Sequence, residues 1–299
     1  MTPYQLKWGP HQLTIGQRTL VMGIVNVTPD SFSDGGRFFD AADAVARAEQ
    51  LVADGADLID IGGESTRPYA EEVSTAEEIR RVIPVIEDLI KRVTIPISID
   101  TTKSEVARRA IEAGAAVIND IGAMRFDPRM PHLAADCGVP VILMHMQGSP
   151  RTMQMNPHYD DLFGEISAFL KQARDQVVRC GVQPEKVILD PGIGFGKTSE
   201  HNLMLIRDLK RFRTLDSPIM MGTSRKAFIR KILKPDHLDD IQADLPLVET
   251  GTQATVAAAV LNGAHMVRVH NVAATKATVK IIDAIKAASG APAIYANEK

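Results

Sequence analysis

Cysteine, aromatic residues and long apolar runs are scarce in this sequence of 299 residues, and these shortages exclude several classes of protein. Two cysteines, Cys137 and Cys180, form no pair motif, which argues against a disulfide scaffold or a structural zinc site and for a reducing compartment. No apolar run approaches the ~18 residues of a membrane span, and the first residues lack the pattern of a signal peptide. Lys and Arg (34) nearly balance Asp and Glu (37), so no general basic surface for nucleic acid is expected.

Short apolar runs alternate with amphipathic stretches along most of the chain, which is typical of parallel strands covered by helices. This pattern predicts a (β/α)8 TIM barrel in the α/β class, with an open doubly wound sheet as the alternative. The predicted strands are 19–25, 56–61, 95–99, 116–120, 139–144, 186–190, 218–221 and 265–269. The predicted helices are 41–54, 75–92, 104–113, 160–180, 199–212, 225–233, 252–262 and 274–288.

The domain organisation follows from the same pattern. Residues 1–18 precede the first repeat and are expected to form a short hairpin over one end of the barrel. Residues 19–289 are expected to form a single barrel domain, and 290–299 read as a frayed tail. Within the seventh unit, 233–246 reads as an irregular polar insert.

Polar residues follow the predicted strands at their C-terminal ends, where the active sites of such barrels lie. Asp60, Thr101 and Asp120 are equally explained as turn caps or supporting residues. Two loops, 28–36 and 62–68, are rich in Gly, Ser and Pro and are expected to close over a ligand. Together these features place a binding site at one mouth of the barrel.

Eight short motifs follow one another between about residue 20 and residue 288. They are NVTPDSFSDGG (26–36), IDIGGESTRP (59–68), SIDTTK (98–103), IND (118–120), LMHMQG (143–148), DPGIGFGKT (190–198), TSRK (223–226) and RVH (268–270). The GFGKT run is not a P-loop, because the spacing differs. In this order and combination the motifs resemble the dihydropteroate synthase family of folate biosynthesis.

The resemblance implies an enzyme, a transferase that condenses 6-hydroxymethyl-7,8-dihydropterin diphosphate with p-aminobenzoate. The products are 7,8-dihydropteroate and pyrophosphate. The expected mechanism is dissociative: pyrophosphate leaves first, and the amine of p-aminobenzoate then attacks a delocalised pterin cation. By the same resemblance the catalytic residues are Asp100, Lys226 and Arg67.

The resemblance also assigns the pterin contacts. A carboxylate at Asp190 can accept from two neighbouring pterin N–H groups, because it has two acceptor oxygens. Asn119 can both donate and accept, and Lys226 can donate to the ring carbonyl oxygen. The full set implied by the family is Asp100, Asn119, Met144, Asp190, Phe195 and Lys226.

The resemblance assigns diphosphate binding to Asn26, Arg268 and His270. Arg268 and His270 alternate along one predicted strand and therefore share a face, where they would supply positive charge. Asn26 would contribute one oxygen ligand to the implied cofactor Mg²⁺, which prefers few protein ligands together with waters and phosphate oxygens. The p-aminobenzoate pocket implied by the family consists of Thr66, Arg67, Pro68, Phe195 and Lys226.

Three positions and one segment depart from the family pattern. They are Ala227 in place of Ser, Asn271 in place of Asp, Tyr69 in place of Gly, and 247–252, which lack a familiar Arg. The lost hydroxyl at position 227 removes one hydrogen bond, which contributes roughly 1.5–3 kcal/mol when its partner is charged. These changes affect p-aminobenzoate or sulfonamide affinity more than the reaction itself. The family further implies small-molecule partners, competitive inhibition by sulfonamides, a homodimer and a cytoplasmic location.

Three other functions compete with this interpretation. A methyltetrahydrofolate-type methyltransferase would share the pterin acids but should lack the diphosphate residues Arg268 and His270. A paralogue that binds pterin without turnover is the second alternative. The third, a metal hydrolase built on His145, is disfavoured because no suitable ligand spacing is present.

Overall fold

The fold is described from a computed structural model, which describes residues 3–28, 41–65 and 72–288. Within these ranges, eight parallel strands pair in the order β8-β7-β6-β5-β4-β3-β10-β9. A parallel bridge between Leu189 and Ile219 joins the two edges of this sheet. The predicted barrel is thereby confirmed over the open sheet. The strands are β3 (Leu20–Asn26), β4 (Leu58–Gly62), β5 (Ile97–Asp100), β6 (Val117–Asp120), β7 (Val141–Met144), β8 (Val187–Asp190), β9 (Met220–Met221) and β10 (Met266–Val269).

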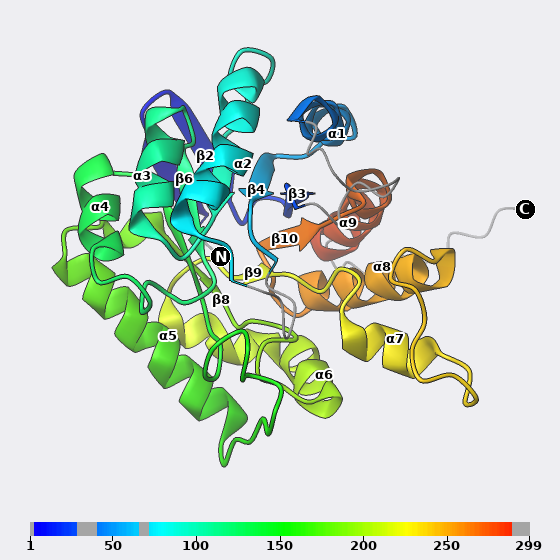
Figure 1. The fold of residues 1–299 in the computed structure, drawn as a ribbon. Helices are drawn as coiled ribbons and strands as arrows, with labels where there is room; N and C mark the ends of the chain where they lie inside the picture. Colours follow the sequence, from blue (N-terminus) through cyan, green and yellow to red (C-terminus); the bar gives the residue numbers. More distant parts are fainter. Residues whose placement is uncertain (1–2, 29–40, 66–71, 289–299) are drawn as a thin grey trace, which may run out of the picture.

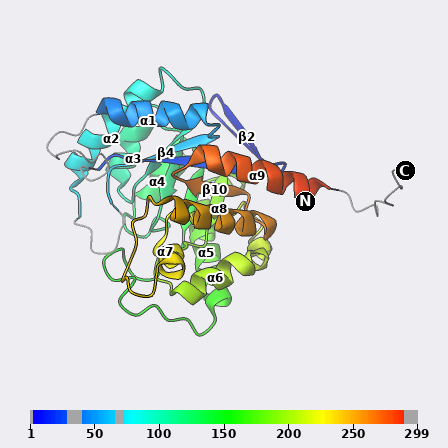
Figure 2. The ribbon, with the colours of Figure 1, turned by 90° about the vertical axis from the view of Figure 1, so that its right-hand side faces the viewer.

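The helices surround the strands on the outside (Figure 1), and α8 and α9 lie side by side there (Figure 2). The α-helices are α1 (Ala41–Ala53), α2 (Thr75–Leu89), α3 (Ser104–Glu112), α4 (Met130–Cys137), α5 (Leu162–Arg179), α6 (Ser199–Arg207), α7 (Ala227–Leu233), α8 (Pro246–Leu261) and α9 (Val272–Ala287). Short 3-10 helices add η2 (Pro184–Lys186) and η3 (Leu209–Leu215). Within the described residues, no helix combines the length and the hydrophobicity that a membrane crossing requires.

Three details differ from the sequence-based prediction. The predicted helix 199–212 is divided into α6 and η3. Helix α4 was not predicted, because it has only eight residues and an apolar pattern too short to show helical periodicity. Helix α8 begins at Pro246, earlier than the predicted start at 252, since a proline fits the first turn of a helix. The seventh unit therefore carries both α7 and α8, with the irregular insert between them.

The expected N-terminal hairpin is present as β1 (Tyr4–Trp8) and β2 (His11–Ile15), which pair antiparallel. Alternation of inward and outward side chains buries Leu6, Trp8 and Ile15 in the main hydrophobic core. The hairpin lies at the N-terminal end of the barrel, because Tyr4 stacks edge-to-face on His265, which immediately precedes β10. The C-terminal ends of the strands stay free of it.

Asp57 connects the segment after the hairpin to the barrel. Its Oδ1 accepts from Arg18 Nη2 at 2.6 Å, and its Oδ2 accepts from Val21 N at 2.9 Å and Lys276 Nζ at 3.2 Å. Burial alone would raise the pKa of Asp57. The hydrogen bonds from Arg18 and Val21 outweigh it and hold the pKa below its ordinary value.

We predict that Asp57→Asn lowers the free energy of unfolding at pH 7 by about 1–3 kcal/mol. The depressed pKa means that the stabilisation is full above the unfolded-state pKa and is lost as the pH falls through the folded-state pKa. The difference between wild type and variant should therefore shrink on acidification. Urea unfolding across this pH range measures it, with Asp54→Asn as the control, whose carboxylate accepts an exposed hydrogen bond from Gln50 Nε2. Equal losses in the two variants would refute the role of Asp57.

Candidate active site

A network of charged side chains crosses the barrel interior near its C-terminal mouth. Arg268 of β10 donates from Nε to Asp60 Oδ2 at 2.6 Å and from Nη2 to Asp100 Oδ2 at 2.7 Å. Asn119 of β6 donates from Nδ2 to the same Asp60 oxygen at 2.9 Å. Three residues predicted for the site are thus brought together, and the residue that joins them is Asp60 of β4, which has no exposed surface.

Burial controls the electrostatics of this network. It raises the pKa of Asp100 to about 7, although the charge of Arg268 acts in the opposite direction. Burial disfavours the charged form of Arg268 too, but the nearby Asp60 and Asp100 outweigh it and raise the pKa of the guanidinium. Arg268 is therefore a permanent cation that is already shared by two carboxylates.

Asp190, Lys226 and Phe195 form the next part of the site. Asp190, the last residue of β8, accepts from Gly192 N at Oδ1 over 2.7 Å, and burial raises the pKa of its carboxyl group. Lys226 Nζ lies 4.0 Å from the centre of the Phe195 ring. Burial and the neighbouring Arg268 lower the pKa of Lys226 to about 8, while the charges of Asp190 and Asp100 oppose the change. Lys226 therefore lies close enough to Arg268, Asp190 and Asp100 for their charges to change its pKa.

An apolar wall completes this region. Met144 and Phe195, both predicted to line the site, belong to one buried cluster that is separate from the main core. Their neighbours in the cluster are Ile121, Met146 and Met153. A flat heterocycle could pack on such a wall while its polar edge meets the carboxylates.

His270 and Asn26 lie at the ends of β10 and β3. The His270 Nδ1 is 2.9 Å from Ser224 Oγ, and burial followed by the charge of Arg225 lowers the pKa of its imidazole to about 3. Burial and the neighbouring cations therefore favour the neutral ring, which can donate a hydrogen bond to a phosphate. Asn26 is exposed and sits opposite Gly62 of β4 in the parallel register.

Thr66, Arg67, Pro68 and Tyr69 lie outside the described residues, but the chain on either side of them is held firmly. Glu64 accepts from Val73 N at 3.0 Å and from Lys103 Nζ at 2.6 Å. Lys103 also donates to the fully buried Glu78 at 2.7 Å. These contacts link Glu64 and Val73 through Lys103 to the buried Glu78 of α2.

The structure gives different roles to Asp60, Thr101 and Asp120, for which the sequence left two explanations open. Asp120 accepts from Gly122 N at 2.7 Å and Thr101 accepts from Lys103 N at 3.2 Å, so both stabilise turns. Asp60 is instead the centre of the network described above. Among the departures, Asn271 caps α9 by accepting from Ala274 N, and Ala227 is the first residue of α7.

Lys197 and His145 were missed as a pair by the sequence analysis. Lys197 is 3% exposed, and its Nζ lies 2.9 Å from His145 Nδ1 and donates to the Phe195 carbonyl oxygen at 3.0 Å. Burial lowers the pKa of Lys197 to about 7 and that of His145 to about 2. The lysine of GFGKT was the only signal, and its partner lies 52 residues away. The pair holds the turn that carries Phe195.

Gly192 is required by the turn after β8, and the chain offers a matched control at Gly138. Both have a positive φ, +73° and +64°, but a methyl group on Gly192 would overlap the His145 carbonyl oxygen, whereas one on Gly138 meets only Lys186 Nζ at 4.0 Å.

We predict that Gly138→Ala costs about 1–2 kcal/mol of unfolding free energy, the usual penalty for a left-handed backbone conformation. Gly192→Ala should cost clearly more, because the backbone beside Asp190 must move. Chemical denaturation of both variants measures this, and equal costs would contradict it.

Comparisons with known proteins show the family to which the chain belongs. Residues 22–270 match the family described as pterin binding enzyme. Dihydropteroate synthase of Synechocystis sp. is 48% identical over 271 residues, which cover 90% of this chain and 91% of that protein. Yersinia pestis dihydropteroate synthase, solved with a sulfonamide drug, has a TM-score of 0.86 at 40% identity over 95% of this chain and 100% of its own. The Xanthomonas albilineans enzyme in complex with 7,8-dihydropteroate has a TM-score of 0.82 at 40% identity, over 93% and 97%. The chain therefore belongs to the pterin binding enzyme family and, within it, to the dihydropteroate synthases, which are transferases of folate biosynthesis.

Proposed function

We propose that this chain condenses 6-hydroxymethyl-7,8-dihydropterin diphosphate with p-aminobenzoate to give 7,8-dihydropteroate and pyrophosphate. The observation that carries the proposal is the convergence of buried and half-buried acceptors, the half-buried Lys226 and Arg268 on a single mouth of the barrel. The product-bound relative from Xanthomonas albilineans supports the identity of the product.

The pterin is proposed to bind through its pyrimidine edge. Gly192 occupies one oxygen of Asp190, so the other oxygen is left to accept a pterin N–H. Asn119 donates from Nδ2 to Asp60, and its carbonyl oxygen is a further acceptor for the pterin. Lys226 would donate to the ring carbonyl, while Met144 and Phe195 pack against the apolar part of the bicycle.

Departure of pyrophosphate requires compensation of negative charge. Arg268 uses two N–H groups on Asp60 and Asp100, and its other N–H groups have no partner within the described residues. They can bind a phosphate oxygen without breaking the network. His270 would add a neutral hydrogen bond.

Mg²⁺ is proposed to bind with the diphosphate rather than in advance of it. Within the described part of the chain, no three His, Cys, Asp or Glu side chains gather to hold a metal. The exposed Asn26 at the end of β3 fits an ion that keeps several waters and takes other ligands from substrate phosphates. Such an ion supplies charge neutralisation on the leaving group.

The reaction is proposed to be dissociative. The C–O bond at the pterin methylene breaks first, and the bonding pair leaves with pyrophosphate. An ionised Asp100 then stabilises the delocalised cation electrostatically until the amine of p-aminobenzoate forms the C–N bond and releases a proton. No side chain acts as a nucleophile, so the main tasks of the protein are orientation and the exclusion of water.

The p-aminobenzoate pocket is proposed from family resemblance at Thr66, Arg67 and Pro68, together with Phe195 and Lys226. The sulfonamide complex of the Yersinia pestis relative supports inhibition of this chain by the same drugs. The homodimer and the cytoplasmic location stay predictions.

A turnover assay tests the proposed reaction against its alternatives. We predict that the wild-type chain releases pyrophosphate from the dihydropterin diphosphate, and that p-aminobenzoate converts this release into dihydropteroate formation. A methyltransferase would release none, and a non-catalytic paralogue would bind the pterin without release. Either of those results would refute the proposal.

We predict that Asp190→Asn weakens pterin binding at least about 100-fold, because the single oxygen of the amide would be used by Gly192 N and its N–H group would face a pterin donor. Calorimetric titration with the pterin measures this, and Asp175→Asn, a surface carboxylate paired with Lys171, serves as the matched control. Unchanged affinity in Asp190→Asn would remove the assignment of that carboxylate.

Arg67→Gln should spare pterin affinity and impair use of p-aminobenzoate.

A further inference from the structure

The turn after β8 that carries Phe195 is held by side chains from a distant part of the chain. Gln154 Nε2 donates to the carbonyl oxygen of Gly194 at 2.6 Å, and the hydroxyl of Tyr159 donates to the carbonyl oxygen of Gly196 at 2.7 Å. Both donors belong to the segment between β7 and α5, and they lie 40 and 37 positions from their acceptors along the chain. Neither donor takes part in the proposed reaction.

The carbonyl group between these two belongs to Phe195 itself, and Lys197 binds it. Lys197 Nζ donates to this oxygen at 3.0 Å and lies 2.9 Å from His145 Nδ1. His145, the first residue after β7, packs edge-to-face on Phe169 of α5 with 4.8 Å between ring centroids, and its centroid is 6.0 Å from that of Tyr159. Three successive carbonyl groups of the turn are therefore each bound by a side chain.

Phe195 needs such external support because it lies between two glycines. Gly194 and Gly196 have φ angles of +81° and +64°, and glycine leaves the backbone more freedom than any other residue. Neighbouring segments confine the turn: a Cβ atom on Gly196 would lie 2.7 Å from Gln147 Cβ, and one on Gly194 would lie 3.1 Å from Lys226 Cδ. Contacts from other segments, rather than the Gly-Phe-Gly sequence, therefore set the position of the ring.

The ring of Phe195 joins this support to the candidate active site. It packs in the apolar cluster with Met153, which comes from the same segment as Gln154 and Tyr159. Lys226 Nζ lies 4.0 Å from the centroid of the ring. A shift of the turn would therefore move the ring relative to this lysine, and family resemblance assigns both residues to the p-aminobenzoate pocket.

We propose that Gln154, Tyr159 and Lys197 are positioning residues for p-aminobenzoate. They hold the turn so that Phe195 and Lys226 together face the incoming aromatic amine. The inference rests on the proposed function, because that function assigns the pocket. The pterin should depend less on these three residues, since its polar edge is proposed to bind acceptors on β6 and β8.

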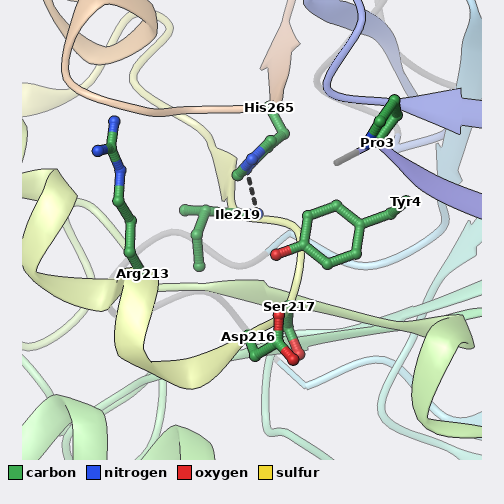
Figure 3. A pocket seen from close by; sticks show the side chains of 7 residues that line it. All are labelled: Pro3, Tyr4, Arg213, Asp216, Ser217, Ile219 and His265. Atoms are coloured by element: carbon green, nitrogen blue, oxygen red, sulfur yellow. Dashed lines mark hydrogen bonds between the residues drawn. The ribbon is translucent and has the colours of Figure 1, made fainter. Parts of the chain in front are cut away.

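Steady-state kinetics of the full chain test this role. Tyr159→Phe removes only a hydroxyl, and Gln154→Met replaces the amide of a side chain of similar length, so each should raise KM for p-aminobenzoate about threefold, and the double variant about tenfold. Both kcat and KM for the pterin diphosphate should stay within about twofold, because the acceptors for the pterin edge are untouched. The control is Tyr4→Phe, which loses a hydroxyl hydrogen-bonded to Asp216 at the opposite end of the barrel (Figure 3) and should change none of these values.

A combination with Phe195→Leu separates positioning from a general loss of stability. If Tyr159 acts through the aromatic ring, Tyr159→Phe should change KM for p-aminobenzoate by less than about 1.5-fold once the ring is absent. An equal rise in both backgrounds, or an unchanged KM in both Tyr159→Phe and Gln154→Met, would overturn the inference. The same rise in Tyr4→Phe would overturn it too.

The wild type distinguishes this inference from the proposed function. If the wild type forms dihydropteroate and the variants keep its KM for p-aminobenzoate, only the positioning role is overturned. A wild type that forms no dihydropteroate would overturn the proposed function, and this inference with it.

Discussion

One guanidinium organises the C-terminal mouth of this barrel. Arg268 bridges Asp60 and Asp100, and Asn119 shares the Asp60 oxygen, so four strands, β10, β4, β5 and β6, are linked through side chains. Removal of the cation would leave a fully buried carboxylate at Asp60 without its charge partner, which costs several kcal/mol. The two carboxylates can stay in the barrel because Arg268 neutralises their charge, and the same Asp60 oxygen holds the Asn119 amide in place.

The strands could be predicted from the sequence because each is a short, nearly continuous apolar run, the pattern that burial on both faces imposes. β4, for example, is buried at every residue. Helix α4 could not be predicted, since eight residues that begin Met-Pro carry too little periodicity. The beginning of α8 was hidden for a related reason: Pro246 was assigned to the insert, although it occupies the first turn of the helix.

Individual residues of the site could be predicted from the sequence, but the contacts between them could not. Asp100 and Asp190 stand at the ends of strands, where barrel geometry gathers side chains, and this rule needs only the local sequence. The contact between Arg268 and Asp60 joins residues 208 positions apart, and no local pattern reports it. Nor could sequence show that burial keeps His270 neutral, because its pKa depends on packing. The Lys197–His145 pair could not be predicted either, because its members lie 52 positions apart and their pKa values depend on packing.

A crystal structure of the chain with dihydropterin and pyrophosphate tests the central claim most directly. The account predicts that the pterin edge lies on Asp190 and Asn119, with Lys226 at its carbonyl oxygen. It also predicts pyrophosphate on the free side of Arg268, with the bridge from that guanidinium to Asp60 and Asp100 intact. A pterin bound away from this mouth, or a site in which Arg268 has left both carboxylates, would contradict it.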